Sequence, residues 1–274
     1  MSSPFPARKR WGQHFLVDSG VARRIVAAAS IRPGETVVEI GPGDGALTRV
    51  LLESAADRFA AIEIDPLRAH ALQQELGGAG LRVLRGDVLE KPIAEWIAEA
   101  ALRPPAVIVA NLPYNAATPI LSRAVEETCA VSRIVATVQR EVARRFVAVP
   151  GSDDYGFLSV RSALFSRGEI LFSIPPGAFR PRPKVVSSVL RLTPKEPPLS
   201  GPGLDRVLEI ASAGFSMRRK NLPNALSALG SRQAWAEALA RCGFRASSRA
   251  EELAATDFVL LASEESRLRR GSES

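Results

Sequence analysis

Short apolar runs alternate with helical patterns through the first two-thirds of the chain. Helical spacing predicts a first helix over 19–29, with Asp18 as its N-cap. Later helices are expected at 46–53, 67–76, 93–101, 119–127 and 139–147, and the apolar runs that predict strands lie at 36–40, 59–64, 81–84, 106–110 and 133–138. Strands that alternate with helices in this way predict an α/β fold with a mostly parallel, doubly wound sheet.

Two further apolar runs, at 158–165 and 185–192, also have a strand-like composition. No helix of comparable length is expected between them, so they could close the sheet as an antiparallel edge. The connection 169–183 is rich in proline and contains Pro175-Pro176-Gly177, which predicts a loop.

A stretch of turn-forming residues divides the chain near residue 195. Residues 194–203 are dominated by proline and glycine, which is typical of an interdomain linker. Beyond this linker, helical spacing with little strand character covers 204–213, 222–229, 234–242 and 251–261. We therefore expect a sheet domain over 1–195 and a small helical domain over 196–274.

The composition is that of a globular intracellular protein. No apolar run approaches the ~20 residues that span a bilayer, and the N-terminus lacks the apolar core of a signal peptide. The two cysteines, Cys129 and Cys242, form no CxxC pair and support neither a disulfide framework nor a structural zinc site. The two histidines leave too few ligands for another transition metal. We expect a cytoplasmic protein without membrane contact or bound metal.

The net charge of +7 is unevenly distributed along the chain. Residues 8–34 carry +5, residues 35–102 carry −6, and residues 133–184 carry +5. Basic segments that flank an acidic middle are typical of a protein that binds a polyanion and has a separate pocket for a small ligand.

A glycine-rich turn, Gly41-Pro42-Gly43-Asp44-Gly45, directly follows the strand at 36–40. Glycines let the backbone turn sharply and let a ligand approach closely. Glu63 ends the second expected strand, where its carboxylate can accept the two hydroxyl groups of a ribose, and Asp87 follows the third. Three such signals at successive strand ends predict a nucleoside-containing cofactor at one sheet edge. At this point a nicotinamide dinucleotide and S-adenosylmethionine both fit.

The fourth strand ends in Asn111-Leu112-Pro113-Tyr114, whose chemistry suits transfer to an adenine amine. The amine lone pair is delocalised into the ring, so an enzyme that alkylates it must make that lone pair available. The Asn111 side-chain carbonyl and the Leu112 main-chain carbonyl could hold both amine hydrogens and favour a pyramidal nitrogen. Pro113 fixes the turn, and Tyr114 offers a ring on which a flipped base can stack. No strong general base is needed, because the proton becomes acidic once the methyl group has been transferred.

The whole chain resembles the bacterial small-subunit ribosomal RNA adenine N6-dimethyltransferases, the kasugamycin-sensitivity methyltransferase family. The motifs that carry the resemblance are Lys9–Leu16, the glycine turn, Asn111–Asn115 with Thr118-Pro119, Gln139–Arg145, Tyr155–Val160, Phe179–Val185, and Phe215 with Arg218-Arg219-Lys220. This family implies a Rossmann-like class I methyltransferase sheet with S-adenosylmethionine as cofactor. The Asn111–Tyr114 motif and the basic segments are left unexplained by a nicotinamide oxidoreductase.

The resemblance also implies a role for individual residues. His14, Leu16 and Gly43 would touch the cofactor, Gly41 would line its methionine end, Glu63 would hold the ribose, and Asp87 would hold the adenine amine. Asn111 would lie between cofactor and target base, and Phe179 would sandwich the base opposite Tyr114. His14 stands where other members carry Asn, which keeps a hydrogen-bonding side chain. The residues expected to contact RNA are Arg140, Arg144, Arg145, Arg218, Arg219 and Lys220.

The implied reaction is dimethylation of two adjacent adenosines near the 3′ end of 16S ribosomal RNA. The expected partner is the RNA in an immature 30S subunit, and the enzyme is expected to be a monomer with a role in subunit biogenesis. Two alternatives stay open. One is a large-subunit RNA methyltransferase of the macrolide-resistance type, against which the Arg218-Arg219-Lys220-Asn221-Leu222 stretch argues. The other is an assembly factor whose catalysis is dispensable.

Overall fold

The chain forms two compact units. The computed structural model describes residues 13–54, 58–199, 202–217 and 219–272. The sheet unit comprises 1–143 and 166–194, and the helical unit comprises 144–165 and 195–274. The division therefore differs from the single break expected near residue 195, because the segment 144–165 groups with the C-terminal helices.

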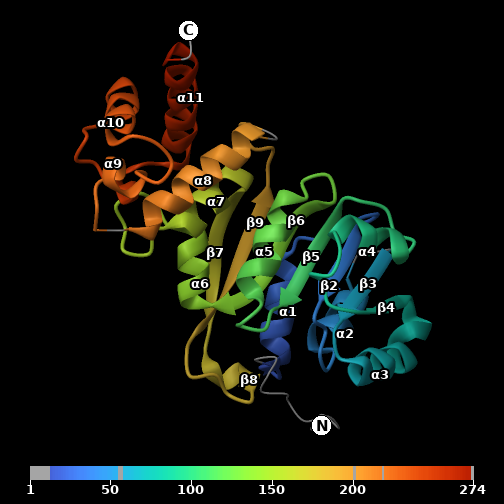
Figure 1. Ribbon diagram of the computed structural model, residues 1–274. Coiled ribbons are helices and arrows are strands. Elements are labelled where there is room, and N and C mark those ends of the chain that lie inside the picture. Colours follow the sequence, from blue (N-terminus) through green and yellow to red (C-terminus); the bar gives the residue numbers. More distant parts are fainter. Residues whose placement is uncertain (1–12, 55–57, 200–201, 218, 273–274) are drawn as a thin grey trace. The chain divides into compact units, whose positions relative to one another are not determined.

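The sheet unit is built on a seven-stranded sheet with the order β4-β3-β2-β5-β6-β9-β7 (Figure 1). The first five strands in this order are parallel, and β9 and β7 are antiparallel to their neighbours. Their bounds are β2 Thr36–Ile40, β3 Arg58–Glu63, β4 Leu81–Arg85, β5 Ala106–Asn111, β6 Val131–Gln139, β7 Ser166–Ile174 and β9 Ser187–Pro194. The prediction of a mostly parallel, doubly wound sheet is confirmed.

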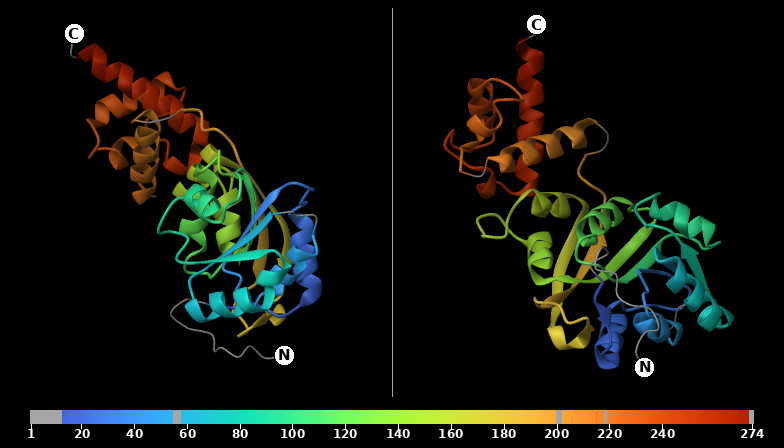
Figure 2. Two further views of the ribbon diagram at one scale, coloured as in Figure 1. Left: turned by 90° about the vertical axis from the view of Figure 1, so that its right-hand side faces the viewer. Right: turned by 60° about the horizontal axis from the view of Figure 1, so that its bottom comes forward.

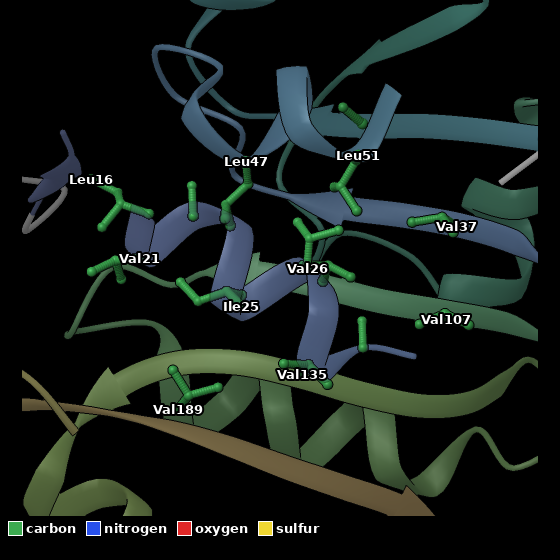
Figure 3. Close-up of a cluster of buried hydrophobic side chains, with 14 of the residues drawn as sticks. Leu16, Val21, Ile25, Val26, Val37, Leu47, Leu51, Val107, Val135 and Val189 are labelled. Carbon is green, nitrogen blue, oxygen red and sulfur yellow. The ribbon is translucent and has the colours of Figure 1, made fainter. Parts of the chain in front are cut away.

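Helices precede, connect and follow the parallel strands. They are α1 Ser19–Ala28, α2 Ala46–Leu52, α3 Pro66–Leu76, α4 Ile93–Glu99, α5 Ala117–Glu126 and α6 Arg140–Val147. On one face of the sheet, Ile25 of α1 and Leu51 of α2 belong to the same buried cluster as Val37, Val107 and Val135 of three neighbouring strands (Figure 3). Because side chains alternate between the faces of a strand, these odd-numbered positions form one continuous apolar layer.

Side-chain hydrogen bonds satisfy backbone groups at both ends of helix α1. Asp18 accepts a hydrogen bond from the Val21 N–H, as the sequence predicts. At the other end, Arg133 of β6 donates to the carbonyls of Ala29 and Ser30, at 2.6 and 2.9 Å. The same guanidinium makes a two-pronged ion pair with Glu35, which ties the helix end to the strand that follows it.

Removal of the Glu35 carboxylate should make the protein less stable at neutral pH but not in acid. The Arg133 hydrogen bonds lower the pKa of Glu35 from 4.5 to about 2. Because the folded-state pKa is depressed, the stabilisation is complete above about pH 4.5 and is lost as the pH falls toward about 2. We expect Glu35→Ala to lower the free energy of unfolding by about 1.5–3 kcal/mol near pH 7. Urea unfolding of both proteins near pH 7 and in acid measures this, and an equal difference at both pH values would contradict it.

The edge of the sheet after α6 differs from the sequence prediction. The run at 158–165, expected as a strand, is the helix α7, Phe157–Phe165. Ser159 and Ser162 are buried in it together with apolar residues, so its pattern does not separate a short buried helix from a strand. The expected loop 169–183 instead begins with β7, which pairs with β9 from Ser166↔Pro194 to Ile174↔Ser187. The antiparallel edge exists, but most of its outer strand, residues 169–174, was assigned to the loop by the prediction.

A second, two-stranded sheet was not predicted. Strand β1, Phe15–Leu16, pairs antiparallel with β8, Phe179–Arg180, and places Leu16 opposite Phe179. The 3₁₀ turn η3, Pro176–Ala178, precedes β8, and the Ala178 carbonyl accepts the Val17 N–H at 2.9 Å. This pairing holds the described part of the N-terminal segment against the loop after β7.

The helical unit contains α7 and the C-terminal helices, which lie together in Figure 2. The C-terminal helices are α8 Pro202–Ser216, α9 Leu222–Ala225, α10 Arg232–Arg241 and α11 Ala255–Ser272. Tyr155 anchors them, because its hydroxyl donates to the Leu253 carbonyl at 2.8 Å and its ring lies edge-on to Phe215 at 5.7 Å. The helical character expected of the C-terminal segment is thus present, with boundaries shifted by several residues.

No helix within the described ranges is long and apolar enough to cross a membrane. Among these residues, no group of three or more His, Cys, Asp or Glu side chains could hold a metal ion.

Candidate active site

Three neighbouring parallel strands end side by side and bring the predicted cofactor residues together. In the sheet register Ile40 of β2 lies opposite Ile62 of β3 and Ala110 of β5. The next residues along the three strands are Gly41, Glu63 and Asn111. The fold therefore places these three residues at one edge, where parallel α/β sheets bind ligands.

The glycine turn is fixed by Glu63. One carboxylate oxygen accepts the Gly43 N–H and the other accepts the Asp65 N–H, both at 2.9 Å. Glu63 is only 2% exposed, and this burial raises its pKa. Gly41 and Gly43 both have positive φ, and a Cβ at Gly43 would come within 2.9 Å of the Phe15 ring. Side chains at these positions would strain the turn.

A pocket opens at this edge of the sheet. Eight of the predicted site residues line it: His14, Leu16, Gly41, Gly43, Glu63, Asn111, Leu112 and Pro113. Further lining residues, which sequence reasoning did not assign, include Gln13, Phe15, Glu39, Asp44 and Ile64. A Cβ on Gly41 would meet no atom within 4 Å, so the turn leaves space for a ligand there.

Asn111 is oriented by the N-terminal segment. Its side-chain NH2 group donates to the His14 carbonyl at 2.9 Å, which leaves the side-chain carbonyl available as an acceptor. The Leu112 N–H donates to the Thr137 carbonyl at 3.1 Å, and the Leu112 carbonyl accepts no hydrogen bond from the described residues. The two acceptors that were expected to hold an adenine amine are therefore both present at the pocket.

Tyr114 lies next to the pocket and is held from two sides. Its hydroxyl lies 2.7 Å from the Ser187 hydroxyl, and its ring centroid lies 5.0 Å from that of His14. The His14 Nδ1 lies 2.6 Å from the Pro181 carbonyl oxygen. His14 thus links the pocket, the ring of Tyr114 and the loop after β8.

Besides Tyr114, two of the predicted catalytic and cofactor-binding residues do not line the pocket. Asp87 lies in the turn after β4, where its carboxylate accepts the Leu89 N–H at 2.9 Å. Phe179 was expected to sandwich the target base opposite Tyr114; in the structure its side chain is 2% exposed and belongs to the hydrophobic cluster of the sheet unit. Its pairing with Leu16 in the small sheet accounts for this burial. Roles for Asp87 at the adenine and Phe179 at the target base stay predictions.

The basic residues expected to contact RNA lie on two separate elements. Arg140, Arg144 and Arg145 are exposed on α6, whose residues Val142 and Phe146 are buried. This amphipathic arrangement places the three guanidinium groups away from the core. Arg219 and Lys220 are exposed between α8 and α9, and Arg218 lies outside the described residues, as do Lys9 to Gly12 of the N-terminal motif.

The least expected feature is the buried side chain of Arg68 on α3. It is 1% exposed, forms an ion pair with Asp44 of the glycine turn, and lies 3.8 Å from Asp65. Its guanidinium carbon also lies 4.2 Å from the centroid of the Phe15 ring. Arg68 therefore contacts two residues that line the pocket, Asp44 and Phe15. The sequence gives no signal for this, because an arginine in an amphipathic helix normally faces solvent.

The chain is similar to known ribosomal RNA methyltransferases over most of its length. A family model for ribosomal RNA adenine dimethylase matches residues 5–265. Ribosomal RNA small subunit methyltransferase A of Methylococcus capsulatus is 40% identical over 92% of this chain and 95% of the relative. The protein of that name from Acidothermus cellulolyticus is 41% identical over 93% of this chain and 88% of the relative.

Two solved structures share the fold of almost the whole chain. The 23S rRNA methyltransferase ErmE matches with a TM-score of 0.68 and 27% identity over 92% of this chain and 99% of that chain. A dimethyladenosine transferase from Plasmodium falciparum matches with a TM-score of 0.76 and 24% identity over 90% of this chain and 96% of that chain.

The predicted family is supported by two findings. One is the pocket with its Asn111 and Leu112 acceptors, and the other is the sequence similarity over residues 5–265. The chain belongs to the ribosomal RNA adenine dimethylase family and is an enzyme that dimethylates adenine in ribosomal RNA with S-adenosylmethionine as cofactor.

Proposed function

We propose that this enzyme dimethylates N6 of two adjacent adenosines near the 3′ end of 16S ribosomal RNA. Its substrate is the RNA within an immature 30S subunit, on which it acts as a cytoplasmic monomer and contributes to ribosome biogenesis. The observation that favours the small subunit is the 40% identity, across 92% of the chain, to a small-subunit methyltransferase.

The residues of the pocket suit S-adenosylmethionine. The space in front of Gly41 offers room for the methionine end, and the buried Glu39 Oε2, which has no hydrogen-bond partner among the described residues, offers it a polar group. Glu63 would accept the ribose hydroxyls, because a carboxylate offers about four lone-pair sites and the Gly43 and Asp65 N–H groups use two of them. When bound, this cofactor supplies an electrophilic methyl group on a sulfonium.

The remaining chemistry belongs to the loop after β5. The Asn111 side-chain carbonyl and the Leu112 main-chain carbonyl accept the two N6 hydrogens of the target adenine, so that the nitrogen lone pair turns toward the cofactor. Tyr114 presents a ring, already oriented by Ser187 and His14, on which the flipped base stacks. After each transfer the positively charged nitrogen loses its proton to water.

The exposed arginines of α6 suit the RNA backbone. Charge reversal at Arg144 and Arg145 together is expected to weaken RNA binding by tenfold or more at about 0.1 M salt, because phosphate contacts carry much of the affinity. Cofactor affinity should change little, since neither residue lines the pocket. Filter binding of RNA and calorimetry with the cofactor measure the two effects, and an equal loss of both would count against an RNA-binding role for α6.

The large-subunit alternative is supported by the structural match to a 23S rRNA methyltransferase, at 27% identity. Small-subunit relatives reach 40–41% identity over a similar share of the chain, so we favour the small subunit. An assembly factor with dispensable catalysis is a second alternative. It predicts that Asn111→Ala still supports subunit maturation in cells that lack the wild-type enzyme.

The subunit preference can be tested with labelled S-adenosylmethionine. The acceptors are unmethylated small subunits, large subunits and protein-free RNA of each kind, and nucleoside mass spectrometry identifies the product. We expect N6,N6-dimethyladenosine from small subunits only. Label in large-subunit RNA would assign the enzyme to the macrolide-resistance type, and cofactor binding without transfer to any acceptor would favour the assembly factor.

A further inference from the structure

The segment Arg180-Pro181-Arg182-Pro183-Lys184 carries three cationic side chains, none of which has been given a role. It lies within residues 170–195, which contain no Asp or Glu. All three cations are exposed, and no ion pair or side-chain hydrogen bond joins any of them to another described residue. Cations that neutralise no group of the described protein are available to an anionic ligand.

The start of segment 180–184 is fixed against the wall of the pocket. Strand β8 pairs with β1 and places Arg180 opposite Phe15. The Pro181 carbonyl oxygen lies 2.6 Å from His14 Nδ1. Because His14 and Phe15 both line the pocket, the first two residues of the segment lie directly beside it.

The end of segment 180–184 is fixed beside Tyr114. Ser187 follows Lys184 by three residues, and its hydroxyl lies 2.7 Å from the Tyr114 hydroxyl. Pro183 is buried, although the residues on both sides of it are exposed. Since Pro181 and Pro183 have a fixed φ, the backbone that carries the cations has little freedom to move. The cations are therefore held close to the ring on which the target base would stack.

A flipped adenosine brings negative charge to this side of the pocket. Unstacking and unpairing the base has a free-energy cost, which the enzyme has to offset. The phosphate groups on both sides of the nucleotide are covalently linked to it, so a base stacked on Tyr114 carries two anions toward the ring. Cations that meet these anions only after the base has flipped shift the equilibrium toward the flipped state.

We propose that Arg180 and Arg182, with Lys184 beside them, form a phosphate-binding site for the flipped adenosine and the adjoining nucleotide. This site stabilises the flipped state, whereas the first docking of the RNA depends on other exposed cations, such as those of α6. The inference rests on the proposed stacking of the target base on Tyr114. It does not depend on which ribosomal RNA is the acceptor.

The salt dependence of the reaction sets the size of the expected effect. Each phosphate contact to single-stranded RNA makes an equilibrium constant fall with about the 0.7 power of the salt concentration. Loss of two contacts should therefore reduce the slope of log rate against log salt by about 1.4. At about 0.1 M salt this corresponds to a loss of roughly 10- to 30-fold in the flipped population.

Single-turnover methyl transfer by the full-length enzyme tests the proposal. The acceptor is the unmethylated ribosomal subunit that the wild-type enzyme methylates, and both subunit and S-adenosylmethionine are saturating, so the rate reports the steps after docking. The test variant is Arg180→Gln/Arg182→Gln, and Arg180→Lys/Arg182→Lys keeps both charges. Filter binding of the subunit, calorimetry with the cofactor and thermal unfolding are measured for each variant.

Arg58→Gln/Arg103→Gln is the matched control, because it makes the same change in charge far from the pocket. Arg58 begins β3 and Arg103 precedes β5, so both exposed arginines lie near the amino ends of strands whose carboxyl ends form the site. This variant should transfer methyl groups at close to the wild-type rate.

We expect Arg180→Gln/Arg182→Gln to slow transfer roughly 10- to 30-fold at about 0.1 M salt and to reduce the salt slope by about 1.4. Its affinities for subunit and cofactor should change by less than about threefold, because the phosphates are contacted after docking. The lysine variant should keep most of the rate. The proposal is overturned if the glutamine variant transfers as fast as the wild type, or if the lysine variant is equally slow. It is also overturned if the loss lies in subunit affinity and disappears at saturation.

Discussion

Replacement of Asn111 by alanine is expected to slow methyl transfer by roughly 100- to 1,000-fold, the usual effect of removing one preorganised polar group that acts on developing charge. The substitution removes the side-chain carbonyl that would hold one hydrogen of the adenine amine. It also removes the hydrogen bond to the His14 carbonyl that fixes the N-terminal side of the pocket. Single-turnover rates at saturating S-adenosylmethionine and ribosomal substrate measure the chemical step.

Asn115→Ala provides a control in the same loop, because Asn115 is exposed and does not line the pocket. It should retain activity within a few fold of the wild-type value. Thermal unfolding of both variants shows whether the loop remains folded. If Asn111→Ala kept more than a tenth of the wild-type rate, the assignment of Asn111 to the adenine amine would be wrong.

Replacement of Arg68 by alanine is expected to lower the free energy of unfolding by about 3–5 kcal/mol, because it removes a buried cation from the buried Asp65 and the partly buried Asp44. Asp65 is itself 2% exposed, and Asp44 belongs to the glycine turn. The Phe15 ring would also lose the guanidinium that lies 4.2 Å from its centroid. Because Phe15 and Asp44 both line the pocket, cofactor affinity should fall in the same variant.

Urea unfolding followed by circular dichroism measures the loss, with Arg191→Ala as its control. Arg191 pairs with Glu169 across β9 and β7 at 2.7 Å, but both side chains are partly exposed. An ion pair of this kind contributes less than about 1 kcal/mol. An Arg68→Ala protein no less stable than Arg191→Ala would show that Arg68 does not support the pocket.

The parallel part of the sheet could be predicted from sequence because each strand there is a short apolar run between two helical patterns. Strands β2 and β5 are buried along most or all of their length, so both faces are apolar and the runs are easy to recognise. The register then brings Gly41, Glu63 and Asn111 together without further assumptions. This part of the site follows from the rule that ligands bind at the carboxyl ends of parallel strands.

The antiparallel edge could not be predicted in the same way. The segment of α7 has buried serines among its apolar residues, and β7 is largely exposed, so neither has the pattern of its structural class. Strands β1 and β8 are two residues long each, and their pairing joins segments more than 160 residues apart. Such pairing depends on tertiary contacts, which local sequence patterns do not encode.

Buried charge is the other feature that local patterns miss. Glu39 is the acidic residue in the otherwise apolar run Val37-Val38-Glu39-Ile40, and that isolation is a signal that could have identified it. Arg68 offers no comparable signal, since its neighbours on α3 are mixed polar and apolar residues. Arg68 is buried because α3 packs against the glycine turn and the N-terminal segment, and these tertiary contacts are not encoded in the local pattern of α3.

The most direct test of the proposed reaction is to map the methylated positions. Unmethylated immature 30S subunits are incubated with the enzyme and S-adenosylmethionine, and the modified RNA is analysed by reverse transcription and by mass spectrometry of its fragments. We expect N6,N6-dimethyladenosine at two adjacent positions near the 3′ end of 16S ribosomal RNA, formed at least about 100-fold more slowly by Asn111→Ala. Dimethyladenosine at another site, or at these sites with Asn111→Ala at the wild-type rate, would contradict it.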